Sequence, residues 1–313
     1  MIGLVVKRLI ATVPVLLVVA IVIFAVLRLT PGDPATLVAG DAASQEQIAE
    51  IRRNMGLDQP VPVQFVQWLG NMVRGDFGIS LISGRPVSEL IMDRLGATLS
   101  LTFLTLFYTL AISLPLGVLS AWKRGRALDR LVMAGSVAGF SVPVFIVAYV
   151  LILVFAIELR WLPVQGYKPL SAGLWEHLRH LILPAMSLGT VYIALITRIV
   201  RTSVIDTLGE DYIRTARAKG LPEWAVLSRH ALQNAAVPIL TVIGISITML
   251  IGGVVVTESV FNIPGLGRLV LDSVLSRDFT VIQSLIVLFS LTYIFINLMI
   301  DISYILVDPR IRS

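Results

Sequence analysis

Six long stretches of this sequence contain no Asp, Glu, Lys or Arg, and they constrain the fold more than any other feature. An α-helix rises about 1.5 Å per residue, so roughly 20 apolar residues cross the ~30 Å hydrocarbon core of a bilayer. A charge at the centre of such a helix costs about 2.5–3.5 kcal/mol, which makes six chance gaps implausible. The stretches are 9–27, 97–121, 131–157, 181–197, 237–257 and 279–300. We therefore predict an all-α, polytopic membrane protein with six transmembrane helices.

Composition supports this class and excludes some chemistry. Hydrophobic residues make up 56% of the chain and charged residues 14%, whereas soluble domains have about 45–50% and about 25%. Cysteine is absent, which excludes disulfides, a thiol nucleophile and thiolate metal ligands. Pro115, Pro143 and Pro184 fall within the uncharged stretches, where neighbouring helices can satisfy the freed backbone groups. We expect the net charge of +5 to reflect loops beside a lipid bilayer, with no nucleic-acid partner.

The placement of lysine and arginine predicts the orientation. If the N-terminus lies inside the cell, the inner segments hold 14 of these residues and the two short outer loops hold five. Cytoplasmic loops carry the excess of positive charge in multi-spanning proteins, so we expect both termini to be cytoplasmic. The first stretch is longer than the apolar core of a secretory signal and lacks a small-x-small cleavage site. We interpret it as a retained anchor.

The spans divide the chain into three parts. Residues 1–30 contain the N-terminal cytoplasmic end and the first helix, and residues 31–96 form an extracytoplasmic segment. Residues 97–313 form a core with the other five helices, a loop at 201–236 and a cytoplasmic C-terminal tail.

The extracytoplasmic segment contains signals for two short helices. Ser44 and Gln47 have the spacing of a capping box, and Gly56 suits a helix end, which predicts a helix over 44–55. The apolar side of a second helix is formed by Phe65, Trp68, Leu69 and Met72. We interpret the segment as a cap over the outer mouth of the bundle.

The loop between the fourth and fifth spans has the clearest local pattern. Asp211 and Lys219 suit the two ends of a helix dipole. Gly220 suits a left-handed cap, and Pro222 can begin the next helix. The pattern predicts two short helices that meet at a tight corner. Small side chains there would let a partner dock closely, whereas the positive-inside rule alone predicts a solvated basic loop. Both interpretations remain open.

Short motifs also follow one another in a fixed order around the spans. They are Thr30-Pro31-Gly32-Asp33-Pro34, Gly75-Asp76-Phe77-Gly78-Ile79-Ser80, Leu162-Pro163 with Gly166-Tyr167, Leu183-Pro184 with Ser187-Leu188-Gly189, Thr257-Glu258-Ser259-Val260-Phe261 with Pro264-Gly265-Leu266-Gly267-Arg268, and Asp308-Pro309-Arg310-Ile311-Arg312. Each motif alone is weak. Together with the loop at 211–222 they resemble the binding-protein-dependent ABC transporter permeases, and within them the first permease of the dipeptide, oligopeptide and nickel class, to which glutathione importer permeases are close. The resemblance covers nearly the whole chain.

One position departs from the pattern of the broader permease superfamily. There, Glu-Ala-Ala precedes the glycine of the loop, whereas the aligned residues here are Arg214, Thr215 and Ala216. The downstream proline of that pattern falls on Gln233. The peptide branch commonly has this form, and the departure argues against an acidic contact from position 214 to a partner.

The resemblance implies the type I fold of ABC importer permeases in a multi-pass protein of the bacterial cytoplasmic (inner) membrane. It implies a second, homologous permease, two ABC ATPases that bind ATP and Mg, and an external solute-binding protein. This chain would then be a non-catalytic subunit that binds no cofactor itself, and it contains no G-x-x-x-x-G-K-[ST] phosphate loop. Di- and oligopeptides are the substrates expected first, with glutathione or a nickel chelate as alternatives in the same role.

By the same resemblance, the corner couples ATPase motion to alternating access, and Gly220 is its most constrained position. The residues assigned to coupling are Tyr212, Arg214, Thr215, Ala216, Arg217, Ala218, Lys219, Gly220, Leu221 and Pro222.

Polar residues within the spans can line a pathway or form hydrogen bonds between helices. These candidates are Ser141, Ser187, Thr190, Ser246 and Asn297. Candidates for an outer gate follow the fifth span, where a structural bond or a plain chain reversal is equally open. These candidates are Glu258, Pro264, Gly265 and Gly267.

The remaining interpretations have less support. His177 and His180 are three residues apart, but no third ligand is identifiable, so we expect no metal site. A secondary transporter would place ionisable groups near the membrane midplane and repeat its two halves. An intramembrane enzyme would place paired catalytic groups inside spans, whereas all three histidines lie outside them.

Overall fold

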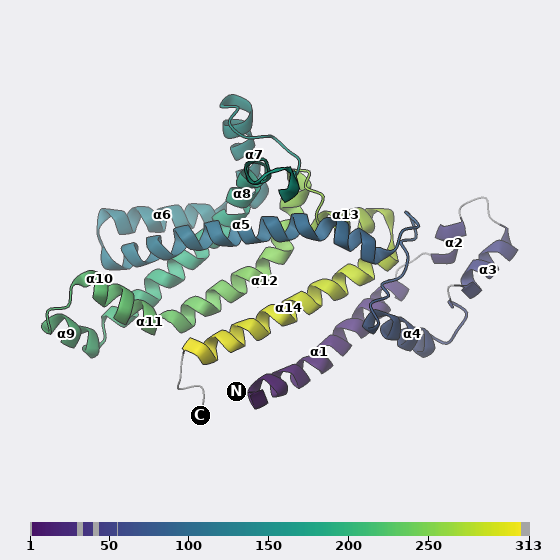
Figure 1. Ribbon diagram of the computed structural model, residues 1–313, viewed down its shortest axis with the longest axis horizontal. Coiled ribbons are helices and arrows are strands. Elements are labelled where there is room, and N and C mark those ends of the chain that lie inside the picture. The colour runs from purple at the N-terminus through teal and green to yellow at the C-terminus, as the bar shows by residue number, and fades with distance from the viewer. Residues whose placement is uncertain (1, 30–33, 40–43, 55, 308–313) are drawn as a thin grey trace. The chain divides into compact units, whose positions relative to one another are not determined.

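The computed structural model of the chain describes residues 2–29, 34–39, 44–54 and 56–307 (Figure 1). Two predicted motifs lie partly or wholly outside these residues: 30–33 of the first motif, and the C-terminal tail at 308–313. The chain forms two compact units, which are described separately. The first unit is Met1–Gly96 with Arg268–Phe295, and the second unit is Ala97–Gly267 with Ile296–Ser313.

All six predicted spans are helical. The elements that contain them are α1 (Ile2–Leu29), α5 (Val87–Trp122), α6 (Ala127–Ser141) followed by α7 (Val144–Leu151) and η1 (Ile152–Glu158), α8 (Leu174–Leu208), α12 (Ala236–Val260) and α14 (Phe279–Val307). Among the described residues, α5, α8, α12 and α14 are each long and apolar enough to cross a membrane. The pair formed by α6 with α7 and η1 gives a fifth crossing if it is one bent span, and α1 contains a further apolar run, Ala11–Ala25.

The third span is broken, so the expectation of one continuous helix over 131–157 is wrong. The helices on either side of the break are bent by 104°. Val142 is extended, with ψ of 124°, and Pro143 precedes the first residue of α7. The ring of a proline disfavours helical geometry in the residue before it, which explains the end of α6. Pro115 and Pro184 instead lie inside α5 and α8.

Shorter elements connect the spans. They are α2 (Pro34–Ala39), α3 (Gln45–Asn54), α4 (Val61–Val73), η2 (Leu170–Ala172), α9 (Asp211–Ala218), α10 (Glu223–Ala225), η3 (Val226–Ala231), α11 (Leu232–Asn234) and α13 (Leu266–Ser276).

The predicted capping box begins α3. The Ser44 backbone N donates to Gln47 Oε1 at 2.9 Å, and the Gln47 backbone N donates to Ser44 Oγ at 3.3 Å. At the other end, Gly56 has a positive φ of 65° and its N–H donates to the Arg53 carbonyl. Both predicted ends of this helix are confirmed.

The first unit is held by aromatic packing and by a buried carboxylate. Phe24 of α1 packs edge-on against Phe65 of α4 at 5.4 Å between ring centroids, and Trp68 lies 5.7 Å from Phe24. Asp278 accepts a hydrogen bond from Ser80 Oγ at 2.5 Å. Because Asp278 also caps the start of α14, the loop that carries Ser80 is fixed to that helix.

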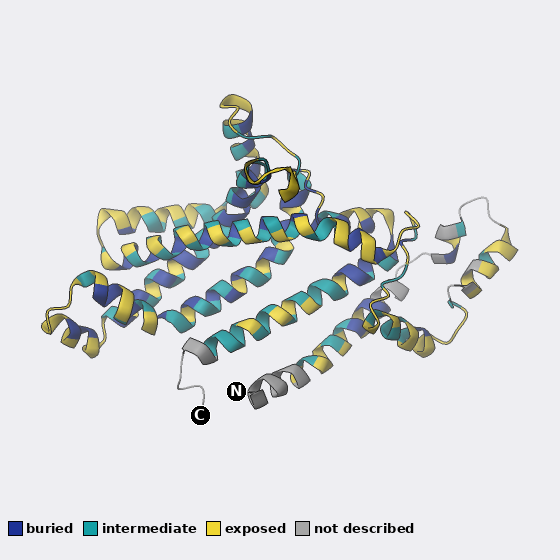
Figure 2. Ribbon diagram, in the orientation of Figure 1, coloured by how far each residue is buried: buried dark blue, intermediate teal, exposed yellow. Residues whose placement is uncertain are grey.

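In the second unit, α8 contacts α6, α7 and α12. Its buried positions run from His177 to Thr207 (Figure 2). One apolar cluster surrounds Leu181 and Leu188 and includes Phe261. Another surrounds Val200 and Val204. The fourth span, which has the shortest uncharged stretch, is therefore the helix around which this unit packs.

Gly117 allows α5 to approach α8 closely. A Cβ atom at this position would lie 2.6 Å from Val200 Cβ and 3.0 Å from the Thr197 carbonyl oxygen. Gly135 of α6 is different, because a Cβ there would meet no atom of the described part of the chain within 4 Å.

We expect Gly117→Leu to destabilise the folded chain by about 1–3 kcal/mol, because the added side chain overlaps Val200. The measurement is the midpoint of thermal unfolding of the purified protein in detergent. Gly135→Leu, also in a helix interior, is the matched control and should lower the midpoint less. Equal midpoints for the two variants would contradict the tight α5–α8 contact.

Candidate functional site

The corner between α9 and α10 has the geometry that the sequence predicts. Gly220 has a φ of +79°, a left-handed conformation that glycine adopts at little cost. Its N–H donates to the Arg217 carbonyl at 2.9 Å, and the Leu221 N–H donates to the Ala216 carbonyl at 3.3 Å. Pro222 precedes α10, and its carbonyl accepts the first hydrogen bonds of that helix. The chain therefore turns from α9 to α10 within the four residues 219–222.

One face of the corner packs inside the chain. Ile213 and Ala216 of α9 are buried, and α9 contacts η3, in which Val226 is fully buried. Arg217 Nε donates to Glu223 Oε1 at 2.8 Å across the turn. Apolar packing holds α9 against η3, and the half-exposed ion pair adds a contact across the turn. Ala216, one of the residues assigned to coupling, lies on this internal face.

The opposite face of the corner is open. Tyr212 and Leu221 are exposed apolar or aromatic side chains, and Trp224 of α10 is 65% exposed. A Cβ at Gly220 would meet no described atom within 4 Å. Partial burial raises the pKa of the Tyr212 hydroxyl, and the charge of Glu210 raises it further. The other exposed residues assigned to coupling are Arg214, Thr215, Arg217, Ala218, Lys219 and Pro222.

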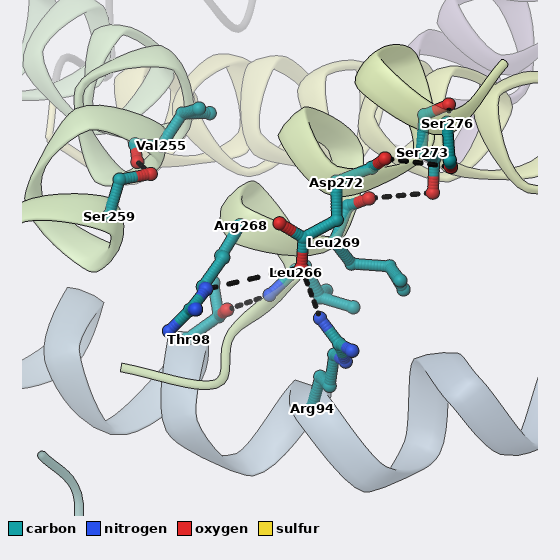
Figure 3. A network of polar contacts seen from close by, with 10 residues as sticks. All are labelled: Arg94, Thr98, Val255, Ser259, Leu266, Arg268, Leu269, Asp272, Ser273 and Ser276. Atoms are coloured by element: carbon teal, nitrogen blue, oxygen red, sulfur yellow. Dashed lines mark hydrogen bonds and ion pairs between the residues drawn. The ribbon is translucent and has the colours of Figure 1, made fainter. Parts of the chain in front are cut away.

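Three of the four residues predicted to form an outer gate, Glu258, Gly265 and Gly267, meet at a buried carboxylate in the second unit. Glu258 of α12 is 0% exposed, and Thr98 Oγ1 of α5 donates to its Oε1 atom at 2.6 Å. The same hydroxyl accepts a hydrogen bond from the Leu266 backbone N at 2.7 Å (Figure 3). One hydroxyl therefore connects the end of α12 to the first residue of α13.

Two glycines make room for this carboxylate. A Cβ at Gly265 would collide with the Glu258 carboxyl group. A Cβ at Gly267 would lie 2.7 Å from Val255 Cα and 3.0 Å from Glu258 Oε2. Pro264, in contrast, is exposed. The motif Pro264-Gly265-Leu266-Gly267 thus wraps the chain against the end of α12.

A second loop packs against the same turn. The Gly166 N–H donates to the Phe261 carbonyl at 2.9 Å, and Gln165 Nε2 donates to the Val260 carbonyl at 3.1 Å. Phe261 is buried in the apolar cluster around Leu181. Two hydrogen bonds therefore join the loop that follows η1 to the turn that follows α12.

The two neighbouring histidines have structural hydrogen bonds. The ring Nδ1 of His177 lies 2.7 Å from the Lys168 carbonyl, and that of His180 lies 2.7 Å from the Glu176 carbonyl. His177 also packs edge-on against Tyr167. Within the described residues, no group of three or more His, Asp or Glu side chains is placed to hold a metal ion.

The hydroxyls proposed to line a pathway or to join helices bond within their own helices. Ser187 donates to the Pro184 carbonyl and Ser246 to the Val242 carbonyl, and both are buried inside this chain. Ser141 and Thr190 donate to carbonyls four residues earlier. These four hydroxyls therefore have acceptors inside their own helices, and their role in lining a pathway or in joining helices stays a prediction. Ser141 is exposed, whereas Thr190 and Asn297 are half-buried.

Sequence reasoning missed two polar partnerships. Nothing in the sequence around Thr98 indicates that its hydroxyl bonds to Glu258 and Leu266, because many spans contain a threonine. Asp129, which is buried, and Arg201, which is partly buried, form an ion pair within the second unit, whereas the charge pattern alone marks Arg201 only as one of the positive inner residues. A signal for this pair was available, because Asp129 is the only acidic residue between Lys123 and Arg130.

Comparisons with known proteins agree with this architecture. Residues 113–313 match the family "Binding-protein-dependent transport system inner membrane component", and residues 1–102 match the N-terminal family of the same transport systems. The chain is 50% identical over 306 residues to a probable peptide ABC transporter permease protein, y4tP, of Sinorhizobium fredii, with 98% of each chain covered. It is 44% identical over 312 residues to the glutathione transport system permease protein GsiC of Salmonella typhimurium, with 100% of this chain and 99% of GsiC covered.

A solved structure shows the same fold. A chain of the MetNI methionine ABC transporter, in an inward-facing conformation, aligns with a TM-score of 0.59 and 21% identity. The alignment covers 70% of this chain and 96% of the MetNI chain. The chain described here is therefore a multi-pass, all-helical membrane protein with the fold of an ABC importer permease, and it belongs to the family of binding-protein-dependent transport system inner membrane components.

Proposed function

We propose that this chain lines the membrane pathway of a peptide importer together with a second, homologous permease. Two cytoplasmic ATPases supply the motion, and an external binding protein delivers the substrate. The observation that carries the proposal is the corner at 211–222, which is fixed on its inner face and open on its outer face. Such a corner can be gripped and moved as a rigid piece.

The positions of the charges support a cytoplasmic location for the corner. Arg214, Arg217 and Lys219 lie on it and are exposed. Because positive loops remain in the cytoplasm, this end of α8 faces the ATPases and both termini lie on the same side. The ATP and Mg are then bound by the partner subunits, and this subunit contributes movement without catalysis.

A peptide-type substrate has the best support. One relative is named for peptides and another for glutathione, and glutathione is itself a small peptide with an isopeptide bond. We infer that di- or oligopeptides are transported, with glutathione as the alternative. The discriminating experiment is ATP-driven uptake of a labelled dipeptide by the reconstituted complex, in competition with glutathione or a nickel chelate. Uptake that continues without ATP would contradict the importer assignment and favour a secondary transporter.

The Glu258 network is proposed as part of the outer gate. Its hydrogen bonds through Thr98 join three segments that must separate or rotate if the outer mouth opens: α5, the end of α12 and the start of α13. A purely structural bond makes a different prediction, because its loss would destabilise the chain without removing the need for the binding protein.

We expect Gly220→Trp to uncouple the complex. The side chain enters the space that a partner would occupy, and the left-handed backbone is strained by about 1–2 kcal/mol in any residue with a Cβ. ATP hydrolysis should continue, while uptake per ATP hydrolysed falls by roughly tenfold, within the usual range of coupling between sites. Uptake assays and ATPase assays on the same proteoliposomes provide the measurement.

Gly84 is the matched control for this substitution. It also has a positive φ, 68°, and a Cβ there would meet no described atom within 4 Å, but it lies in the segment predicted to be extracytoplasmic. Gly84→Trp should leave the affinity for the ATPase subunits unchanged. Full coupling in the Gly220 variant would show that the corner does not transmit the motion.

We expect Thr98→Val to destabilise the chain by about 1–3 kcal/mol, because it leaves a buried carboxylate and a backbone N–H each short of a partner. Thr98→Ser keeps the hydroxyl and should behave like the wild type. If the network closes a gate, the valine variant should also show uptake in the absence of the binding protein. A lower unfolding midpoint with uptake that still requires the binding protein would mean that the bond is structural only.

A further inference from the structure

A second buried polar cluster lies in the second unit, away from both the corner and the Glu258 network. Its centre is the Asp129 carboxylate, which is 4% exposed. Arg201 Nε donates to Oδ1 at 2.5 Å and Arg201 Nη2 donates to Oδ2 at 2.8 Å. Ser120 Oγ donates to Oδ1 at 2.5 Å, and the Gly125 N–H donates to Oδ2 at 2.8 Å. The carboxylate therefore accepts four hydrogen bonds.

These bonds join three helices and a turn. Ser120 lies in the last turn of α5, Gly125 in the connecting turn, and Asp129 in the first turn of α6. Arg201 belongs to α8. The close approach of Gly117 to Val200 lies beside the cluster, one turn from Ser120 along α5 and next to Arg201 along α8. Both polar and apolar contacts thus fix the same ends of α5 and α8.

The energetics indicate a positional role. Burying an ion pair costs desolvation energy that its Coulomb attraction repays only in good geometry, so apolar side chains of similar size would often hold the helices as well. What a bidentate guanidinium–carboxylate pair adds is a defined orientation. The pair therefore specifies how the α5–α6 turn sits on α8, more than how strongly it is held.

The cluster lies close to the corner along the chain. Arg201 precedes the end of α8 at Leu208 by seven residues, about two helical turns. The corner helix α9 begins at Asp211. A movement of the corner is therefore transmitted along a short stretch of α8 to this cluster, where Arg201 bonds to Asp129 of α6 and Asp129 in turn accepts from Ser120 of α5.

We propose that Asp129 and Arg201 are positioning residues for coupling. Through their bidentate pair, the ends of α5 and α6 move with α8 as one rigid body when the ATPases move the corner. This inference rests on the proposed docking of the ATPases at the corner. In this proposal the two side chains transmit the motion of α8 to α5 and α6, which neither the corner nor the Glu258 network does.

The first experiment separates coupling from assembly. Arg201→Lys keeps the charge and most of the side chain but cannot form the bidentate pair. In the reconstituted complex, uptake per ATP hydrolysed should fall at least about fivefold, the lower end of typical coupling between sites, while basal ATP hydrolysis and subunit composition are retained. Asp129→Asn should have the same effect. The matched control is Arg198→Lys, at an exposed position one turn earlier on α8, which should couple normally.

The second experiment measures whether α6 and α8 keep a constant separation when ATP binds. It is done first with Asp129 and Arg201 intact and then with Arg201→Lys. The chain has no cysteine, so Arg126→Cys and Arg198→Cys, both at exposed positions, can carry a single pair of spin labels. The distance between the labels should be the same with and without bound ATP, and should change or broaden with ATP once Arg201→Lys is added. A distance that shifts on ATP binding in the unmutated cluster would overturn the proposal, as would normal coupling in Arg201→Lys.

The Gly220→Trp complex, measured in parallel, distinguishes this failure from failure of the corner. If Gly220→Trp uncouples and Arg201→Lys does not, the corner assignment stands and the positioning role is wrong. If neither uncouples, the docking site assumed by both is wrong.

Discussion

The close packing of α8 against its neighbours is the constraint on which the second unit depends. Between membrane helices the lipid tails are as apolar as the side chains, so helices associate through close van der Waals contact, with small residues at the contact points. Gly189 of α8 lies where a Cβ would be 3.0 Å from the Tyr108 ring of α5. Gly253 of α12 lies where a Cβ would be 2.9 Å from Leu188 of α8. Because such interiors are nearly incompressible, a displacement of α8 must displace the helices that touch it.

Polar groups with defined geometry lie towards the two ends of this packing, and two of the hydroxyls between them bond within their own helices. The Glu258 carboxylate is bonded at one end and the Asp129 carboxylate at the other. In between, Ser187 and Ser246 return their hydrogen bonds to their own helices. Apolar contacts allow packed helices to slide by small amounts, whereas hydrogen bonds to charged groups exist in one arrangement or break. This distribution suits a bundle that changes between discrete states at its ends.

The sequence located the spans because the cost of placing a charge in lipid is a local property of each segment. The helix over 44–55 was equally predictable, since the capping box acts within four residues. The break at Pro143 was missed because Pro115 and Pro184 look the same in sequence and yet lie inside continuous helices. Whether neighbours can satisfy the groups that a proline frees is decided by tertiary packing, which a single span does not encode. The acceptors of the hydroxyls could not be predicted for a related reason, because a serine in a helix has its own carbonyls within reach as well as groups on neighbouring helices.

Arg201 shows why the candidate site could be predicted only in part. As one of 14 positive residues on the predicted inner side, it contributes to an orientation rule that depends on numbers and not on partners. Its partner, Asp129, is 72 residues away in sequence, and no periodicity connects two positions on different helices. The corner was found because its glycine, proline and terminal charges are neighbours in the chain. The pair that we propose to carry the corner's motion onward depends on the approach of α6 to α8, which exists only after the bundle has formed.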